Sequence, residues 1–126
     1  MRTAFAVFVF VHAAAHGVGF LNQSFLVGVE DRTSTPALLL SNYARDHRLV
    51  RVLGILWLVI GVAFVIAGIR ILQEAGCAVP WLVGAAAAST VLSIMWVKEA
   101  PFGLVANVII FIVLLVPVLY DRILAV

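Results

Sequence analysis

Charged residues are scarce in this sequence. Only 11% of its 126 residues are charged, whereas 65% are apolar, and the mean hydropathy is +1.22. Soluble domains use charged residues for about a quarter of the chain and apolar residues for about half of it. This scarcity excludes an ordinary soluble domain and predicts an integral membrane protein. The few cations lie between apolar runs and form no basic face, so nucleic acid is excluded as a partner.

Cysteine and the common catalytic motifs are also nearly absent. A single cysteine, Cys77, excludes an intrachain disulfide and a cysteine-based zinc or iron-sulfur site. The sequence contains no phosphate-binding glycine loop, no His-Glu metalloprotease signature and no dinucleotide fingerprint. An ATP-driven or hydrolytic activity is therefore not expected. The sequence leaves enzymatic activity uncertain and favours a protein that is not an enzyme.

Long apolar segments are what the sequence does have. A bilayer core about 30 Å thick requires about 20 helical residues to cross it. Four segments qualify, at residues 3–29, 52–72, 80–97 and 102–120. Because lipid cannot satisfy backbone polar groups, these segments must be helical. The sequence predicts an all-α fold, a four-helix transmembrane bundle that forms one integral membrane domain over residues 1–126.

The long connection between the first two segments, residues 30–51, resembles a short interfacial amphipathic helix. Thr35 and Pro36 suit the start of a helix. Arg45, Arg48 and Arg51 follow at a spacing of three and form a polar stripe that could contact lipid headgroups. Lys and Arg are slightly more numerous in the first and third connections than on the other side. This bias predicts a cytoplasmic first loop.

Tryptophan and proline give further markers along the segments. Trp81 and Trp96 lie near predicted segment ends, where the membrane interface favours indole rings, whereas Trp57 lies a turn or two inside. Pro117 removes a backbone hydrogen bond and should kink the last segment near its end. We expect Trp81 and Trp96 to act as interfacial anchors.

Two series of small residues predict close helix packing. In the second segment a glycine recurs every seven residues, at Gly54, Gly61 and Gly68, so all three lie along one side of a helix. In the third segment small residues recur every four positions, at Ala85, Ser89 and Ser93. These stripes should face other helices of the bundle or of a second copy, and a ligand lying in the groove is the alternative.

Polar side chains in the first segment carry most of the functional signal. His12 and His16 lie about 40° apart on a helix, and Gln23 returns to the same direction. Asn107 adds an amide in the fourth segment. Such side chains in an apolar helix must find partners inside the bundle. We therefore expect His12, His16 and Gln23 to form one polar stripe that faces Asn107, Ser89 and Ser93.

Three uses of this polar core remain open. The imidazoles could be hydrogen-bonded to neighbouring helices and serve only packing. The core could line a pocket for a lipid or a hydrophobic small molecule. Finally, His12 and His16 could bind a metal, or one of them could be the axial ligand of haem or of a chlorin pigment, with a possible role as general base.

Two stretches carry a family resemblance: residues 12–20 (HAAAHGVGF) and residues 96–107 (WVKEAPFGLVAN). With the four-segment layout they resemble small bacterial four-helix membrane proteins, loosely similar to DoxX-like proteins and sometimes labelled transporter permeases. The resemblance implies a multipass protein of the bacterial inner membrane, sometimes the small subunit of a redox complex. The permease label gains no support, because four segments lack the paired broken helices of secondary transporters.

Two functions follow from these observations. The first is an accessory subunit, or a protein that binds a lipid or a hydrophobic small molecule through its polar core. Its partners would be membrane lipid and either further copies of itself or a larger membrane complex. The second is a membrane redox subunit or enzyme that acts on a lipid or quinone, with His12 or His16 as ligand or base.

Overall fold

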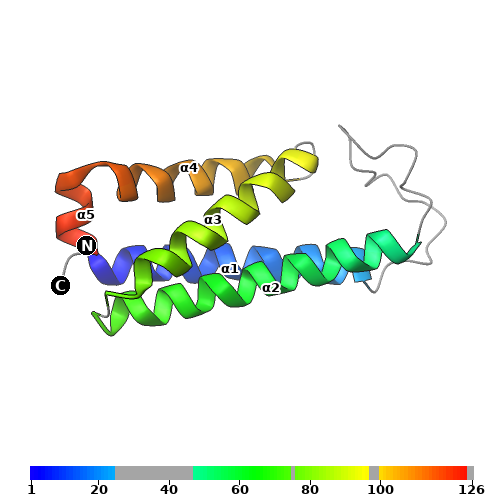
Figure 1. Ribbon diagram of the computed structural model, residues 1–126, viewed down its shortest axis with the longest axis horizontal. Helices are drawn as coiled ribbons and strands as arrows, with labels where there is room; N and C mark the ends of the chain where they lie inside the picture. Colours follow the sequence, from blue (N-terminus) through cyan, green and yellow to red (C-terminus); the bar gives the residue numbers. More distant parts are fainter. Residues whose placement is uncertain (25–46, 75, 97–99, 125–126) are drawn as a thin grey trace.

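The secondary structure of the described residues is entirely α-helical. The computed structural model describes residues 1–24, 47–74, 76–96 and 100–124 (Figure 1). Within these ranges it contains the helices α1 (Arg2–Ser24), α2 (His47–Leu72), α3 (Ala78–Met95), α4 (Pro101–Leu115) and α5 (Pro117–Ile123). The all-α class predicted from the apolar segments is confirmed.

The helices run back and forth along one long axis. Helices α1 and α2 are antiparallel and pack along most of their length, whereas α3 crosses α2 obliquely (Figure 1). Helix α4 packs on α3 and runs back toward the N-terminus, and α5 turns across that end (Figure 1). Residues far apart in the sequence on α1, α3 and α4 can therefore meet in the middle of the bundle.

Three of the helices are long and apolar enough to cross a membrane. These are α1 over Arg2–Leu21, α2 over Arg51–Leu72 and α3 over Ala78–Met95. Helices α4 and α5 pass the same test only as a pair, and they are bent by 93° at their junction. The described part of the chain is therefore compatible with a membrane protein that has three or four spans.

The break between α4 and α5 is sharper than the kink expected from Pro117. Proline has no N–H group to donate, and its ring disfavours helical geometry in the preceding residue. Val116 accordingly has an extended backbone, with φ −91° and ψ 109°. The predicted segment 102–120 is thus two helices. With 15 residues, α4 alone is about 22 Å long at 1.5 Å per residue, which is shorter than a bilayer core.

The interfacial helix predicted for the first connection, with Thr35, Pro36 and Arg45, lies outside the described residues. The structure shows only that α2 already begins at His47. Arg48 and Arg51 therefore belong to the first turns of α2.

Arg2 connects three helix ends at one end of the bundle. Its Nε atom donates to the backbone oxygen of Ile123 at 3.1 Å, and its guanidinium group forms an ion pair with Glu74. Glu74 lies just beyond α2 and has a φ of 56°, in the left-handed region that commonly ends a helix. The side chain of Arg2 thus ties the start of α1 to the ends of α2 and α5.

Glycine allows α1 and α2 to approach closely. A Cβ atom at Gly61 would lie 3.2 Å from both the backbone oxygen of Ala13 and the Cβ atom of His16. At Gly68 it would lie 2.6 Å from the ring of Phe10. Gly54 is also buried. The described contacts of this glycine series therefore lie against α1, within the same chain.

Candidate functional site

Four of the polar residues singled out by the sequence meet in the interior of the bundle. His12 and His16 come from α1, Ser89 from α3 and Asn107 from α4. Their exposed fractions are 5%, 1%, 0% and 1%, so all four are removed from the surroundings of the bundle. Polar groups this deeply buried must hydrogen-bond to one another or to a ligand.

These four residues hydrogen-bond to one another in a closed circuit, which we call the polar ring. Nε2 of His12 lies 3.0 Å from Oδ1 of Asn107, and Nδ2 of Asn107 lies 2.9 Å from Oγ of Ser89. The same Oγ atom lies 2.9 Å from Nε2 of His16, whose Nδ1 atom lies 3.0 Å from the backbone oxygen of His12. The ring therefore joins α1, α3 and α4.

The direction of every hydrogen bond in the polar ring follows from one fixed acceptor. A backbone oxygen can only accept, so Nδ1 of His16 carries the proton. In the neutral imidazole Nε2 of His16 then accepts from the hydroxyl of Ser89, which in turn accepts from the amide NH₂ of Asn107. The amide oxygen is left to accept from Nε2 of His12. All four hydrogen bonds therefore point the same way round the ring, from His12 through Asn107, Ser89 and His16 back to His12.

This circuit predicts different tautomers for the two histidines. In ¹⁵N NMR spectra of the histidine-labelled protein, we expect His16 to be protonated at Nδ1 and His12 at Nε2, each as a single neutral form. Ser89→Ala should leave the proton of His16 on Nδ1, because the backbone acceptor of that proton remains. A proton on Nε2 of His16 in the unmodified protein would show that the ring runs differently.

Aromatic rings enclose the two imidazoles. The rings of His12 and His16 are 4.7 Å apart at 86°, and the Phe64 ring lies 4.7 Å from the first and 5.3 Å from the second. The indole of Trp57 lies 5.0 Å from His16, and Phe8 is stacked on His12 at 6.5 Å. The polar ring is therefore surrounded by an aromatic shell that excludes water from its hydrogen bonds.

The arrangement does not fit a metal ion held by both His12 and His16. Both nitrogens of His16 and Nε2 of His12 are used within the polar ring, which leaves only Nδ1 of His12 outside it. Among the described residues, no group of three or more His, Cys, Asp or Glu side chains could hold a metal ion. Ligation by both imidazoles, or by either nitrogen of His16, would require the ring to open.

The remaining predicted site residues lie at different places. Gln23 belongs to the last turn of α1, but its side chain is outside the described part of the structure. Ser93 is fully buried one turn beyond Ser89 and is not part of the polar ring. Ala85, one turn before Ser89, is buried and lines a groove between α2 and α3.

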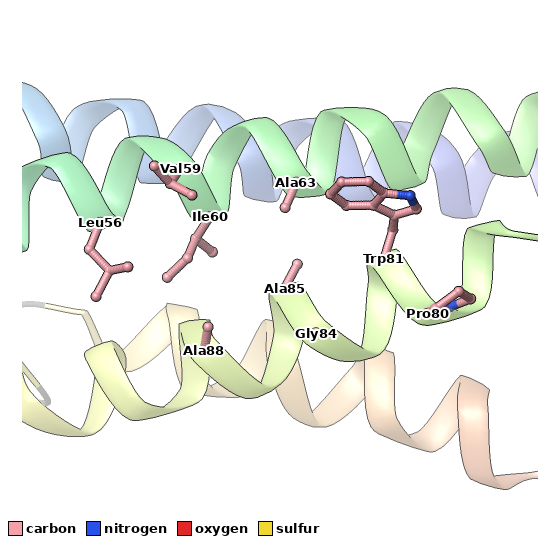
Figure 2. A pocket seen from close by; sticks show the side chains of 9 residues that line it. All are labelled: Leu56, Val59, Ile60, Ala63, Pro80, Trp81, Gly84, Ala85 and Ala88. Atoms are coloured by element: carbon pink, nitrogen blue, oxygen red, sulfur yellow. The ribbon is translucent and has the colours of Figure 1, made fainter.

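That groove lies between α2 and α3, and its lining is mostly apolar. It has a volume of about 380 Å³ and is open along one side (Figure 2). Figure 2 shows that side chains from both helices face the space between them, with the Trp81 indole toward one end. The lining residues are Leu56, Val59, Ile60 and Ala63 of α2 and Pro80, Trp81, Gly84, Ala85 and Ala88 of α3.

Sequence reasoning missed the contribution of two tryptophans. Trp96, expected as an interfacial anchor, is only 3% exposed and lies 6.2 Å from the ring of Trp57, which is 7% exposed. Trp81, in contrast, is 44% exposed. The signal that could have placed Trp57 is Gly19, which shares a helix face with the two histidines. A Cβ atom at Gly19 would lie 2.8 Å from the Trp57 indole.

Comparison of the chain with protein-family models, with curated proteins and with solved structures finds no match. The features of the chain that bear on its function are a closed polar ring, a mostly apolar groove and a buried pair of tryptophans.

Proposed function

We propose that this chain is a multipass membrane protein, folded as a four-helix transmembrane bundle, that binds a lipid or a hydrophobic small molecule and is not an enzyme. The apolar groove between α2 and α3 is the observation that carries the proposal. Its volume of about 380 Å³ lies within the range of small-molecule sites. None of the nine residues that line it is charged and their surface is mostly apolar, which suits an acyl chain or a similar hydrophobic group.

The polar ring supports this function by holding the wall of the groove. Ala85 precedes Ser89 by one helical turn, and Ile60 of the groove precedes Phe64, which contacts both imidazoles. The ring thus stabilises α3 from behind the groove. Because its members satisfy one another, it has few groups left for a reacting molecule. A role for His12 or His16 as general base or redox ligand therefore has less support than binding.

The proposal also covers the membrane in which the bundle lies and its orientation there. The resemblance to small bacterial membrane proteins favours the inner membrane, and the distribution of Lys and Arg favours a cytoplasmic first connection. Arg2 and Glu74 would then lie at the outer end of the bundle, and their ion pair would be near the headgroups, where charge costs little.

Filling the groove should remove the bound molecule and leave the fold intact. A Cβ atom at Gly84 meets nothing within 4 Å, so Gly84→Leu places a side chain in the groove without a clash. Mass spectrometry of protein purified in mild detergent should show a reduction of about fivefold in co-purifying lipid or small molecule. This corresponds to roughly 1 kcal/mol of lost binding free energy.

Gly17→Leu is the matched control for this experiment. Gly17 lies on α1, and its Cβ position is equally open, but it does not line the groove. This variant should retain the bound molecule. Equal ligand content in the unmodified protein, Gly84→Leu and Gly17→Leu would refute the groove as the binding site.

A role as accessory subunit is the second candidate. Gly84 and Ala88 are four residues apart on the open side of α3, a spacing that favours close packing of another transmembrane helix. Native mass spectrometry of the same variants distinguishes the two functions. If a helix of a second copy or of another subunit occupies the groove, Gly84→Leu should dissociate the complex and leave the lipid content unchanged.

A further inference from the structure

Three buried hydrogen-bond donors lie together near the end of the bundle where α3 ends. They are Nε1 of Trp57, Oγ of Ser93 and Nε1 of Trp96, and none has a hydrogen-bond partner within the described structure. The residues are 7%, 0% and 3% exposed. Buried polar groups are nearly always paired, so three unpaired donors in one place require an explanation.

The three side chains form one cluster, which we call the donor cluster. The indole rings of Trp57 and Trp96 are 6.2 Å apart at 70°, and Ser93 lies in the last turn of α3, three residues before Trp96, which caps that helix. On the side of α4, a Cβ atom at Gly103 would lie 2.8 Å from Oγ of Ser93. The absence of a side chain at Gly103 therefore leaves space for this hydroxyl.

The chemistry of these groups restricts what can bind them. An indole N–H group can only donate a hydrogen bond, and a serine hydroxyl can donate as well as accept. A partner must therefore present acceptor atoms, which excludes ammonium groups and metal cations. The surrounding aromatic rings, including that of Trp57, suit an uncharged acceptor better than an anion, since burial of a charge is costly.

We propose that the donor cluster binds the carbonyl oxygen of a lipophilic molecule. The carbonyl oxygen accepts hydrogen bonds from the indole and hydroxyl donors, and no covalent step is involved. Two sources carry this chemistry in a membrane: the acyl ester of a membrane lipid and a free carbonyl compound such as a long-chain ketone. The proposal rests on the unpaired donors and not on the apolar groove, so either site can fail its test without the other.

The indole N–H resonances offer a direct test. The chain has three tryptophans, so ¹⁵N labelling of the indoles gives three signals, of which those of Trp57 and Trp96 report on the donor cluster and that of Trp81 reports on the groove. The full chain is placed in nanodiscs of diester phosphatidylcholine and in nanodiscs of diether phosphatidylcholine, which lacks the carbonyl groups. A 2-alkanone is then titrated into the diether nanodiscs.

If a lipid ester is the ligand, the Trp57 and Trp96 signals should be shifted downfield in diester relative to diether nanodiscs. If the ligand is a free carbonyl compound, the same two signals should move on addition of the ketone. Either result supports the proposal and identifies the source. Indole signals of Trp57 and Trp96 that are the same in both lipids and do not move on addition of the ketone would overturn it.

Variants locate the effect at the donor cluster. Ser93→Ala keeps the size of the side chain and removes one donor, so it should raise the Kd of the responding carbonyl compound roughly fivefold to tenfold. Trp96→Phe keeps an aromatic ring and should have an effect of similar size. Thr90→Ala is the control and should leave the Kd unchanged, because the Thr90 hydroxyl bonds to the backbone oxygen of Ala86 and lies outside both the donor cluster and the groove. A Kd that is insensitive to both Ser93→Ala and Trp96→Phe would also overturn the proposal.

Discussion

Replacing Gly61 by Ile is expected to destabilise the bundle by more than about 3 kcal/mol, or to prevent its assembly. A Cβ atom at this position would lie 3.2 Å from the backbone oxygen of Ala13 and from Cβ of His16. Neither atom is the mobile end of a side chain, so α1 and α2 must separate to admit the new side chain. Overpacking of this kind typically costs about 1 to 3 kcal/mol, and more where the backbone has to move.

The measurement is reversible unfolding in bicelles, with Gly17→Ile as the matched variant. Gly17 lies in α1 with no atom within 4 Å of its Cβ position, so Ile there should change the free energy of unfolding by less than about 0.5 kcal/mol. Similar stabilities for the two variants would mean that α1 and α2 do not approach each other at Gly61. Separation of these helices would also displace His16 and open the polar ring.

Replacing Asn107 by Leu should cost about 2 to 3 kcal/mol of folding free energy. The amide of Asn107 joins the side chain of His12 to the hydroxyl of Ser89 in the polar ring. Its loss leaves the Nε2 proton of His12 without an acceptor at a site that is 5% exposed. A buried donor without a partner costs about 1 to 3 kcal/mol, which is more than the roughly 0.6 kcal/mol that an average hydrogen bond between membrane helices contributes.

Thr90→Ala is the control for this prediction. The hydroxyl of Thr90 donates to the backbone oxygen of Ala86 at 2.7 Å, within α3 and outside the polar ring. Its removal should cost about 0.5 kcal/mol or less, because the carbonyl group remains in the helix. The double variant His12→Phe, Asn107→Leu should be more stable than the sum of the single effects predicts. Additive effects, or equal losses for Asn107→Leu and Thr90→Ala, would exclude a structural role for the ring.

The helices were predictable because their signals are local. Apolar runs define α1, α2 and α3 whatever they pack against, and Pro117 marks the end of α4 through its missing N–H group. The angle of that end was not predictable. A proline permits anything from a mild kink to a complete break, and the 93° bend depends on how α5 packs back toward α1.

The sequence predicted which residues belong to the site but not which of their atoms form hydrogen bonds with one another. His12, His16, Ser89 and Asn107 were all identified as polar residues that need partners inside a bundle. His12 and Asn107 are 95 positions apart, and no local pattern tells which atoms will pair across three helices. The same holds for Trp57 and Trp96, because a tryptophan near the end of an apolar segment is expected at an interface and only helix crossing brings the two together.

The sequence by itself determined that the chain is helical and apolar, and that its few interior polar groups must be paired, since an apolar environment leaves a backbone or side-chain donor no other partner. The tertiary structure decided which pairs form. The crossing of α3 over α2 and the return of α4 place Ser89 and Asn107 beside the histidines, close the polar ring and leave three donors outside it. These outcomes depend on distances between helices, which the order of residues along one helix does not contain.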